Sequence, residues 1–245
     1  VELPIAKASR TFLQRSILSV KDPFAYFYLL AKIHKTPWVT RPIVSCSGSL
    51  LHSLGRWADG ELPRLCRHLP YALRSSTNLV CDLRPLKNLP PDAKLFTCDA
   101  VSMYTNIDTK HALHEIAAFL DSSPIPASEH VNTVALVAAL KIIMEHNVFR
   151  FGDTYWVQLT GTAMGTPPAC MWATLYFAIH EAKVIPQFTD VLKFYHRYID
   201  DGFGLWEPLP DPSADAARWS DFQKAFSSYG KLSWEFSTRS SSVDF

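Results

Sequence analysis

The stretch Phe194-Tyr-His-Arg-Tyr-Ile-Asp-Asp-Gly-Phe203 places two adjacent carboxylates between two apolar and aromatic runs. The pattern predicts a β-hairpin with Asp200 and Asp201 at its turn, and Gly202 is expected to supply an unusual backbone angle there. Neighbouring carboxylates repel each other, so a bound cation would stabilise the pair. Mg²⁺ suits such a site because it binds one or two carboxylates together with substrate phosphates. The alternative is a solvated acidic turn without a cation.

The composition is that of a folded protein. Of the 245 residues, 48% are apolar and 19% are charged, which argues against disorder. The sequence has no run of about 18 uncharged apolar residues, so no membrane span is expected. The chain begins at Val1 without a signal-peptide pattern, and we expect it to be a fragment. Its five cysteines lack a Cys-x-x-Cys pairing, which favours free thiols in a reducing compartment.

Charge is distributed unevenly along the chain, although the net charge is only +1. Residues 1–98 contain 14 Lys and Arg against 6 Asp and Glu, whereas residues 99–245 contain 10 against 17. A basic part followed by an acidic part suits a protein that binds polyanions with one region and metal ions with another. Accidental clustering is the alternative.

Apolar periodicity and turn residues predict a mixture of helices and strands. The expected strands are residues 24–30, a basic hairpin over 31–45, residues 95–97, a hairpin around Gly152-Asp153, and 231–236. The expected helices are part of residues 1–30, then 49–69, 109–120 with Asp108 as N-cap, 132–146, 170–183 and 219–229, the last after a link over 207–217.

Two further segments are candidates for ligand contact. The strand at 95–97 delivers Asp99 at its end, where ligand-binding groups often collect. Residues 161–169 form a loop of small residues that would let the backbone approach a ligand closely. The loop is not a Walker motif, because no Gly-Lys-Ser/Thr follows it.

Four ordered motifs resemble the reverse transcriptase domain of Penelope-like retroelements, a relative of telomerase reverse transcriptase. They are Lys32-Ile-His-Lys35 with Arg41-Pro-Ile-Val-Ser45, then residues 99–107, residues 163–168 and Tyr198-Ile-Asp-Asp201. The resemblance covers nearly the whole chain and implies an α/β (α+β) right-hand polymerase with an antiparallel palm sheet backed by helices. Fingers would comprise residues 1–85 and 122–167, and palm 86–121 and 168–245, with the thumb absent.

The resemblance implies an RNA-directed DNA polymerase that adds dNTPs to a primer 3′ end with two Mg²⁺ ions, for which Mn²⁺ is a substitute. Asp99 and Asp200 would hold the ions, with Asp201 as a weaker ligand or electrostatic helper. The nucleotide-binding residues would be Arg41, either Lys32 or Lys35, Tyr104, Met164 and Gly165. Met164 stands where many reverse transcriptases have glutamine, so no side-chain hydrogen bond forms there. Lys231 is a candidate for a late palm lysine that protonates pyrophosphate.

Tyr104 bears on the choice of sugar. An aromatic ring five residues after Asp99 would lie under the sugar and leave no room for a 2′-hydroxyl, which favours deoxynucleotides. Core packing is the alternative role for this tyrosine.

The expected partners are an RNA template, a DNA primer and dNTPs, and the resemblance implies an intracellular, nuclear location. Without a thumb or the GIY-YIG endonuclease of many such elements, the chain is expected to be weakly processive. Two rival functions stay open. One is a catalytically degenerate domain that only binds RNA or DNA, and the other is an RNA-templated RNA polymerase.

Overall fold

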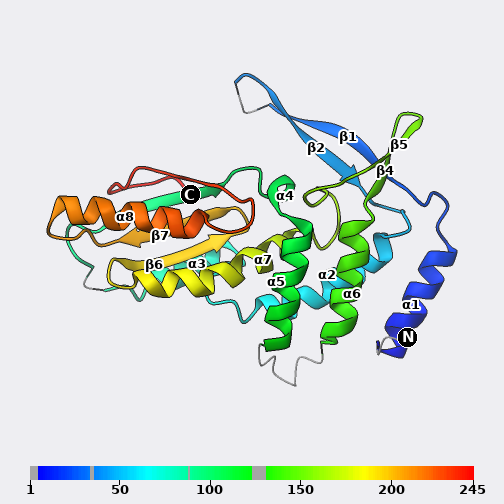
Figure 1. Cartoon of the computed structure of the whole chain (residues 1–245), viewed down its shortest axis with the longest axis horizontal. Helices are drawn as coiled ribbons and strands as arrows, with labels where there is room; N and C mark the ends of the chain where they lie inside the picture. The colour runs from blue at the N-terminus through cyan, green and yellow to red at the C-terminus, as the bar shows by residue number, and fades with distance from the viewer. Residues whose placement is uncertain (1–4, 34–35, 88, 123–130) are drawn as a thin grey trace. The chain divides into compact units, whose positions relative to one another are not determined.

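The computed structural model describes residues 5–33, 36–87, 89–122 and 131–245. The chain forms two compact units, and each unit is built from two segments of sequence. The first unit comprises Val1–Arg67 and Tyr104–Trp172, and the second comprises His68–Met103 and Ala173–Phe245. Figure 1 labels most of their helices and strands. The assignment of residues to fingers and palm, with boundaries after residues 85, 121 and 167, stays a prediction.

The first unit contains a four-stranded sheet in the order β2-β1-β4-β5. Its strands are β1 (Ala25–Lys32), β2 (Val39–Ser45), β4 (Val148–Phe151) and β5 (Thr154–Val157). β1 pairs antiparallel with β2 and parallel with β4, while β4 pairs antiparallel with β5. The hairpin around Gly152 is therefore confirmed, whereas the basic hairpin predicted over residues 31–45 begins at Ala25, because the run expected as a separate strand is its first strand. Gly152 lies in the second hairpin turn with a φ of 60°, a left-handed angle that favours glycine.

Two helices of the first unit, those that start at Thr109 and Thr133, begin next to side chains that cap them. The helices of this unit are α1 (Lys7–Leu18), α2 (His52–Cys66), α4 (Met103–Asn106), α5 (Thr109–Ser122), α6 (Thr133–Glu145) and the first residues of α7 (Ala169–Val184). The Asp108 carboxylate accepts hydrogen bonds from the amides of Lys110 and His111, both at 3.1 Å. Asn132 accepts one from the Ala135 amide at 2.8 Å. These bonds satisfy amide groups that the first turn of a helix leaves without partners.

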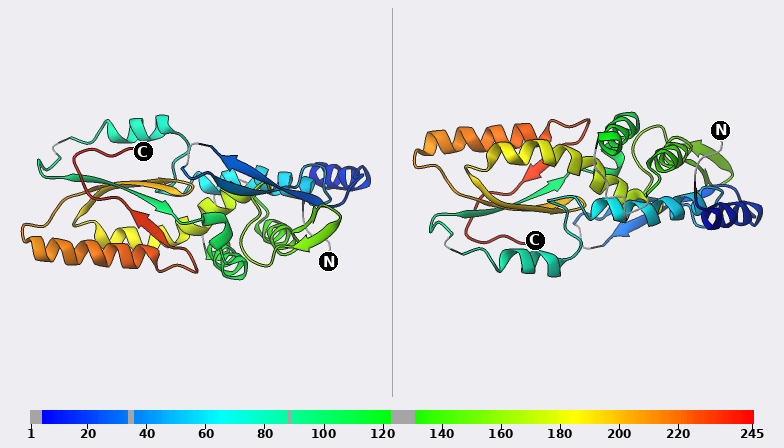
Figure 2. Two further views of the ribbon diagram at one scale, coloured as in Figure 1. Left: turned by 90° about the horizontal axis from the view of Figure 1, so that it is seen from above. Right: turned by 90° about the horizontal axis from the view of Figure 1, so that it is seen from below.

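The second unit contains an antiparallel sheet in the order β6-β7-β3-β8. Its strands are β3 (Lys94–Ala100), β6 (Leu192–Tyr198), β7 (Asp201–Trp206) and β8 (Trp234–Phe236). Within this unit, α7 and α8 (Pro212–Ser227) cover one face of the sheet, and α3 (Ser76–Leu83) and the last residues of the chain cover the other (Figure 2). A short 3-10 helix, η2 (Ile185–Phe188), links α7 to β6. The expected antiparallel sheet backed by helices is confirmed.

Each face of this second sheet packs into its own apolar layer. Toward α8, the buried ring of Phe96 lies edge-on to Phe222, with ring centroids 5.8 Å apart. On the opposite face, Leu73, Leu79 and Phe203 form a buried cluster. Alternation of side chains between the two faces of a strand explains how β3 and β7 supply both layers. Among the described residues, no helix has both the length and the apolar character needed to cross a membrane.

The expected link over residues 207–217 is wrong in its second half, because α8 begins at Pro212. The Asp211 side chain caps this helix by accepting a hydrogen bond from the Ser213 amide at 3.0 Å, and proline is well suited to the first helical position. The expected strand over 231–236 is confirmed only for Trp234–Phe236, because residues 229–232 form a turn closed by a bridge between Tyr229 and Leu232.

Candidate active site

The predicted hairpin turn exists, but its unusual backbone angle belongs to another residue. β6 ends at Tyr198 and β7 begins at Asp201, and Ile199 between them has a φ of 53°. Gly202 lies within β7 and is not among the described residues with positive φ, so its predicted role is wrong. A Cβ atom at Gly202 would collide with the Cys98 sulfur and lie 3.2 Å from the Tyr195 hydroxyl. Glycine is required there by close packing against β3 and β6.

Pairing between strands joins the two acidic segments. In the register of β3 with β7, Asp99 lies opposite Asp201. The Ala100 amide donates a hydrogen bond to the Asp200 carbonyl oxygen at 3.0 Å, which ties the turn to the end of β3. Residues directly opposite in an antiparallel pair share one face, with Cα atoms about 4.5–5.5 Å apart. Residues 102 positions apart in sequence therefore meet, and the individual roles of Asp99, Asp200 and Asp201 stay predictions.

This arrangement brings negative charges together without burying them. Asp99 and Asp201 are both exposed, and Asp200 is half-buried. Partial burial raises the pKa of the Asp201 carboxyl above its usual value, and the neighbouring charge of Asp200 raises it further. Like charges directly opposite on two strands destabilise the pair. A bound cation would remove this cost.

A metal ion at this turn would need ligands besides the side chains of the chain itself. Among the described residues, no group of three or more His, Cys, Asp or Glu side chains is arranged to hold a metal ion by itself. Mg²⁺ commonly binds through one or two carboxylates, with waters and substrate phosphates filling its other positions. The pair formed by Asp99 and Asp201, with Asp200 beside it, is a donor set of this open kind.

In the first unit, Tyr104 is held in place by the loop that precedes α7. Its hydroxyl lies 3.3 Å from the Cys170 sulfur, and its carbonyl oxygen accepts a hydrogen bond from the Thr162 amide at 2.6 Å. Gly161, with a φ of 75°, allows this approach, since a Cβ there would lie 2.6 Å from the Thr105 carbonyl oxygen. The ring of Tyr104 is therefore anchored at its tip and at its backbone.

Met164 and Gly165 lie against β2. The Val44 amide donates to the Met164 carbonyl oxygen at 2.8 Å, and the Cys46 thiol donates to the Gly165 carbonyl oxygen at 3.0 Å. Gly165 has a φ of 119°, and a Cβ there would lie 2.5 Å from the Val44 carbonyl oxygen. The sequence predicts a close approach of this loop to a ligand. In the structure, the loop backbone lies close to the β2 strand of the same chain.

The basic residues of the β1–β2 hairpin share one face. Arg41 is paired with Leu30 and Lys32 with Val39, two pairs further along the hairpin, so both cationic side chains leave the same side of the sheet. Arg41 is exposed and Lys32 is half-buried. Lys35, the other predicted triphosphate contact, lies outside the described residues.

Lys231 belongs to the same unit as the three aspartates. It is exposed in the turn between α8 and β8. β8 pairs with β3, and its Glu235 is the register partner of Asp99. Lys231 therefore lies four residues before Glu235 in the sequence, and Glu235 lies opposite Asp99 at the end of β3.

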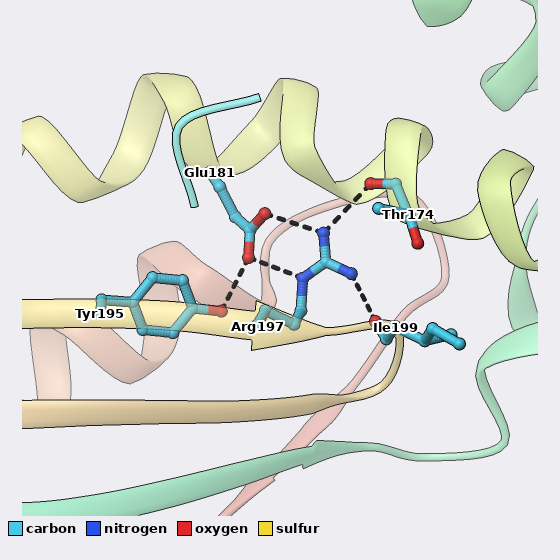
Figure 3. Close-up of polar contacts among 5 residues, drawn as sticks. All are labelled: Thr174, Glu181, Tyr195, Arg197 and Ile199. Carbon is cyan, nitrogen blue, oxygen red and sulfur yellow. Dashed lines mark hydrogen bonds and ion pairs between the residues drawn. The ribbon is translucent and has the colours of Figure 1, made fainter. Parts of the chain in front are cut away.

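A buried ion pair behind the turn was not predicted from the sequence. Arg197 of β6 and Glu181 of α7 are both fully buried and form two hydrogen bonds, from Nε to Oε1 at 2.7 Å and from Nη2 to Oε2 at 2.8 Å (Figure 3). The Tyr195 hydroxyl also donates to Glu181 Oε1 at 2.7 Å. Burial, and then the charge of Glu181, hold the pKa of Tyr195 well above its usual value.

The sequence does contain a signal for this pair. An acid within the apolar run of residues 170–183 requires a partner, because carboxylates are almost never fully buried unless they are paired. Arg197 occupies an inward position in the alternation of β6, which identifies it as a candidate partner.

No protein-family model matches the sequence, and no curated protein matches it either. Solved structures do share its fold. Telomerase from Candida albicans, in complex with a fragment of telomeric RNA, superposes with a TM-score of 0.65 at 10% identity over 97% of this chain and 47% of that one. Apo telomerase from Candida tropicalis, truncated from its C-terminal domain, gives 0.59 at 11% identity over 96% and 55%.

Viral enzymes have the same fold. The RNA-dependent RNA polymerase of a human picobirnavirus superposes with a TM-score of 0.58 at 10% identity, over 87% of this chain and 40% of that one. The chain thus spans about half the length of these polymerases or less. The mixed α/β fold expected for polymerase fingers and palm is confirmed. The narrower resemblance to Penelope-like elements stays a prediction.

Proposed function

We propose that this chain is the reverse transcriptase part of a Penelope-like retroelement, an RNA-directed DNA polymerase that adds dNTPs to a primer 3′ end. The observation that carries the proposal is the pairing of Asp99 with Asp201 across β3 and β7, with Asp200 at the turn between β6 and β7. The polymerase-like fold supports the same reaction class.

The three aspartates would hold two Mg²⁺ ions, or Mn²⁺ in their place. Such ions activate the attacking hydroxyl and neutralise charge on the leaving group in nucleotidyl transfer. The chain's own contribution is to fix the carboxylates at the rigid end of a sheet, where hydrogen bonds between strands set their spacing. Their mutual repulsion in the absence of a cation would be relieved by a bound divalent ion.

The first unit would bind the incoming nucleotide. Arg41 suits the triphosphate because a guanidinium can bind phosphate oxygens in a bidentate manner, and Lys32 or Lys35 would add a point charge. Tyr104 would exclude the 2′-hydroxyl, and Met164 and Gly165 would contact template or nucleotide without a side-chain hydrogen bond. In the second unit, Lys231 is the candidate proton donor to pyrophosphate.

An RNA template and a DNA primer are the proposed polymer partners. The excess of basic residues over positions 1–98 would attract their phosphates. The Candida albicans telomerase with a similar fold was solved in complex with a fragment of telomeric RNA.

Single-nucleotide incorporation tests the proposal without requiring processive synthesis. A preformed DNA primer on an RNA template would be incubated with high concentrations of the chain, Mg²⁺ or Mn²⁺, and either dNTP or rNTP. We expect dNTP to be added, and we expect Asp99→Asn or Asp200→Asn to abolish the addition. Asp221→Asn, which alters an exposed aspartate of α8, is the control and should retain activity.

Three outcomes would contradict the proposal in different ways. Equal or preferred use of rNTP would identify an RNA polymerase. Tight binding of the primer–template without incorporation would identify a catalytically degenerate domain. Incorporation that survives Asp200→Asn would show that the hairpin carboxylate takes no part in the chemistry.

A further inference from the structure

The turn that presents the aspartates is strained at its first residue. Ile199 has a φ of 53°, and this left-handed region is strongly unfavourable for a β-branched side chain. Such a conformation persists only where surrounding contacts impose it. Asp200 follows Ile199 directly, so the contacts that hold Ile199 also determine where the carboxylates of the turn lie.

The contact that holds Ile199 comes from Arg197. Its Nη1 atom donates a hydrogen bond to the Ile199 carbonyl oxygen (Figure 3). The rest of the guanidinium binds Glu181 through two hydrogen bonds and donates from Nη2 to the Thr174 carbonyl oxygen at 3.1 Å. Both of these partners belong to α7. The guanidinium therefore connects a buried helix to the strained peptide of the turn.

The backbone of Arg197 is fixed as well. Its amide donates to the Tyr71 carbonyl oxygen, and its carbonyl oxygen accepts from the Leu73 amide, each at 2.8 Å. Hydrogen bonds thus fix both the backbone of Arg197 in β6 and its guanidinium against α7. Four of the hydrogen bonds that its five N–H groups can make are present, which leaves the planar group little freedom to turn.

We propose that the Glu181–Arg197 pair is a positioning pair that holds the Ile199–Asp200 turn in the conformation needed for metal binding. The proposal rests on the proposed function, since it assigns the pair a role toward the same metal-binding aspartates. Stability alone is a weak reason for such a pair, because apolar residues of similar volume often replace buried ion pairs without loss of stability. Residues that orient metal ligands commonly change metal affinity by about 10–100-fold when they are replaced.

The test replaces the whole polar cluster with apolar residues of similar size. The triple variant E181L/Y195F/R197M leaves no buried charge unpaired but removes the donor to the Ile199 carbonyl oxygen. D190L/R218M is the matched control. Arg218 also binds a carboxylate through two hydrogen bonds, to Asp190 at 2.7 and 3.1 Å, and a carbonyl oxygen, that of Gln187, at 2.5 Å.

Two readouts are compared in the 245-residue chain. Amide hydrogen exchange over residues 198–202 reports the turn itself, and electron paramagnetic resonance of Mn²⁺, added alone, reports metal affinity. We expect the triple variant to fold, to exchange faster at the turn and to bind Mn²⁺ about 10–100-fold more weakly, with the control unchanged. Unchanged exchange and unchanged Mn²⁺ affinity in the folded triple variant would overturn the proposal.

A glycine substitution separates positioning from general stability. Ile199→Gly removes the steric cost of the left-handed angle, so it should restore part of the Mn²⁺ affinity lost in R197K or in the triple variant. If the triple variant does not fold, Mn²⁺ affinity is compared between R197K and R197K combined with Ile199→Gly. If Ile199→Gly does not restore Mn²⁺ affinity, that result counts against the positioning role. If the unaltered chain neither binds Mn²⁺ nor incorporates dNTP, the proposed function fails, whereas exchange at the turn still tests the positioning pair.

Discussion

Asp99 on β3 lies directly opposite Asp201 on β7, and both carboxylates are exposed on the same face of the sheet. An antiparallel pair would ordinarily be more stable with opposite charges or apolar groups at these positions. The structure therefore carries a local cost in stability at the site where the chemistry is proposed, and this cost can be measured.

Replacing Asp201 with asparagine should stabilise the metal-free chain and reduce its activity. The substitution keeps the size of the side chain and removes one of two opposed charges, which is expected to raise the free energy of unfolding by about 0.2–1 kcal/mol. Nucleotide incorporation should fall at the same time. Urea unfolding and single-nucleotide incorporation measure the two effects, and D221N on the exposed surface of α8 should change neither. A destabilised D201N variant would mean that the carboxylate makes a favourable contact in the metal-free chain.

The stability difference between D201N and the unaltered chain should depend on pH. Because the pKa of Asp201 is raised in the folded chain, the folded state holds this proton more tightly than the unfolded state does. The contribution of Asp201 to the free energy of unfolding is therefore greatest below the usual carboxyl pKa. This contribution is lost as the pH rises through the raised pKa of Asp201. We expect the advantage of D201N to vanish at low pH and to be constant near neutrality. Unfolding curves of both proteins across the acid range measure it, and an advantage that grows at low pH would reverse the assigned sign.

Added Mg²⁺ should reverse the order of stability. A ligand that binds only the folded state stabilises it by mass action, by about 2.7 kcal/mol when its concentration is 100 times the dissociation constant. The melting temperature of the unaltered chain should rise with Mg²⁺, whereas D99N and D201N should respond less. Na⁺ at equal ionic strength controls for screening of surface charge. Equal shifts in all three proteins would place the bound ion elsewhere.

Substituting Gly202 tests the packing role found for it. A methyl group there would press on Cys98 and Tyr195 in a closely packed layer, so Gly202→Ala should destabilise the fold by about 1–3 kcal/mol. Gly60→Ala is the matched control, since nothing lies within 4 Å of its added Cβ and it lies within α2. Alanine should stabilise that helix by up to about 1 kcal/mol. If G202A were as stable as the unaltered chain, β3 and β7 would have to be able to move apart.

Local signals made the elements predictable from sequence. Alternation around Gly152 predicted one hairpin, and Asp108 predicted the start of one helix, because each pattern acts through bonds between close neighbours in the chain. The Asp200–Asp201 turn was predictable for the same reason. The meeting of Asp99 with this turn followed from a resemblance between motifs, since no short-range pattern encodes the register of β3 with β7.

Contacts between distant residues account for what the sequence did not reveal. The sequence places Gly202 in the turn because glycine is common in turns. The actual reason for glycine there is the Cys98 sulfur, which belongs to another strand and excludes a side chain. In sequence, Arg197 lies in an aromatic run and its partner Glu181 in an apolar helical stretch. Only the packing of α7 on β6 brings their charges together.

Tyr104 provides the test that separates DNA synthesis from RNA synthesis. If its ring excludes the 2′-hydroxyl, Tyr104→Ala should lower the preference for dNTP over rNTP by about 10–200-fold, the range that a change in pocket size commonly gives. The change should appear mainly as better use of rNTP, measured as kcat/KM for each nucleotide in single-nucleotide incorporation.

Two controls distinguish this role from packing. Cys170→Ala removes the contact at the Tyr104 hydroxyl but keeps the ring, and Tyr155→Ala removes an exposed tyrosine of β5. Both should keep the preference for dNTP. Tyr104→Phe should also keep it, since exclusion by a ring does not need the hydroxyl. A loss of all incorporation in Tyr104→Ala, together with a lower melting temperature, would instead assign the ring to the packing of residues 104–105 against the loop at Gly161.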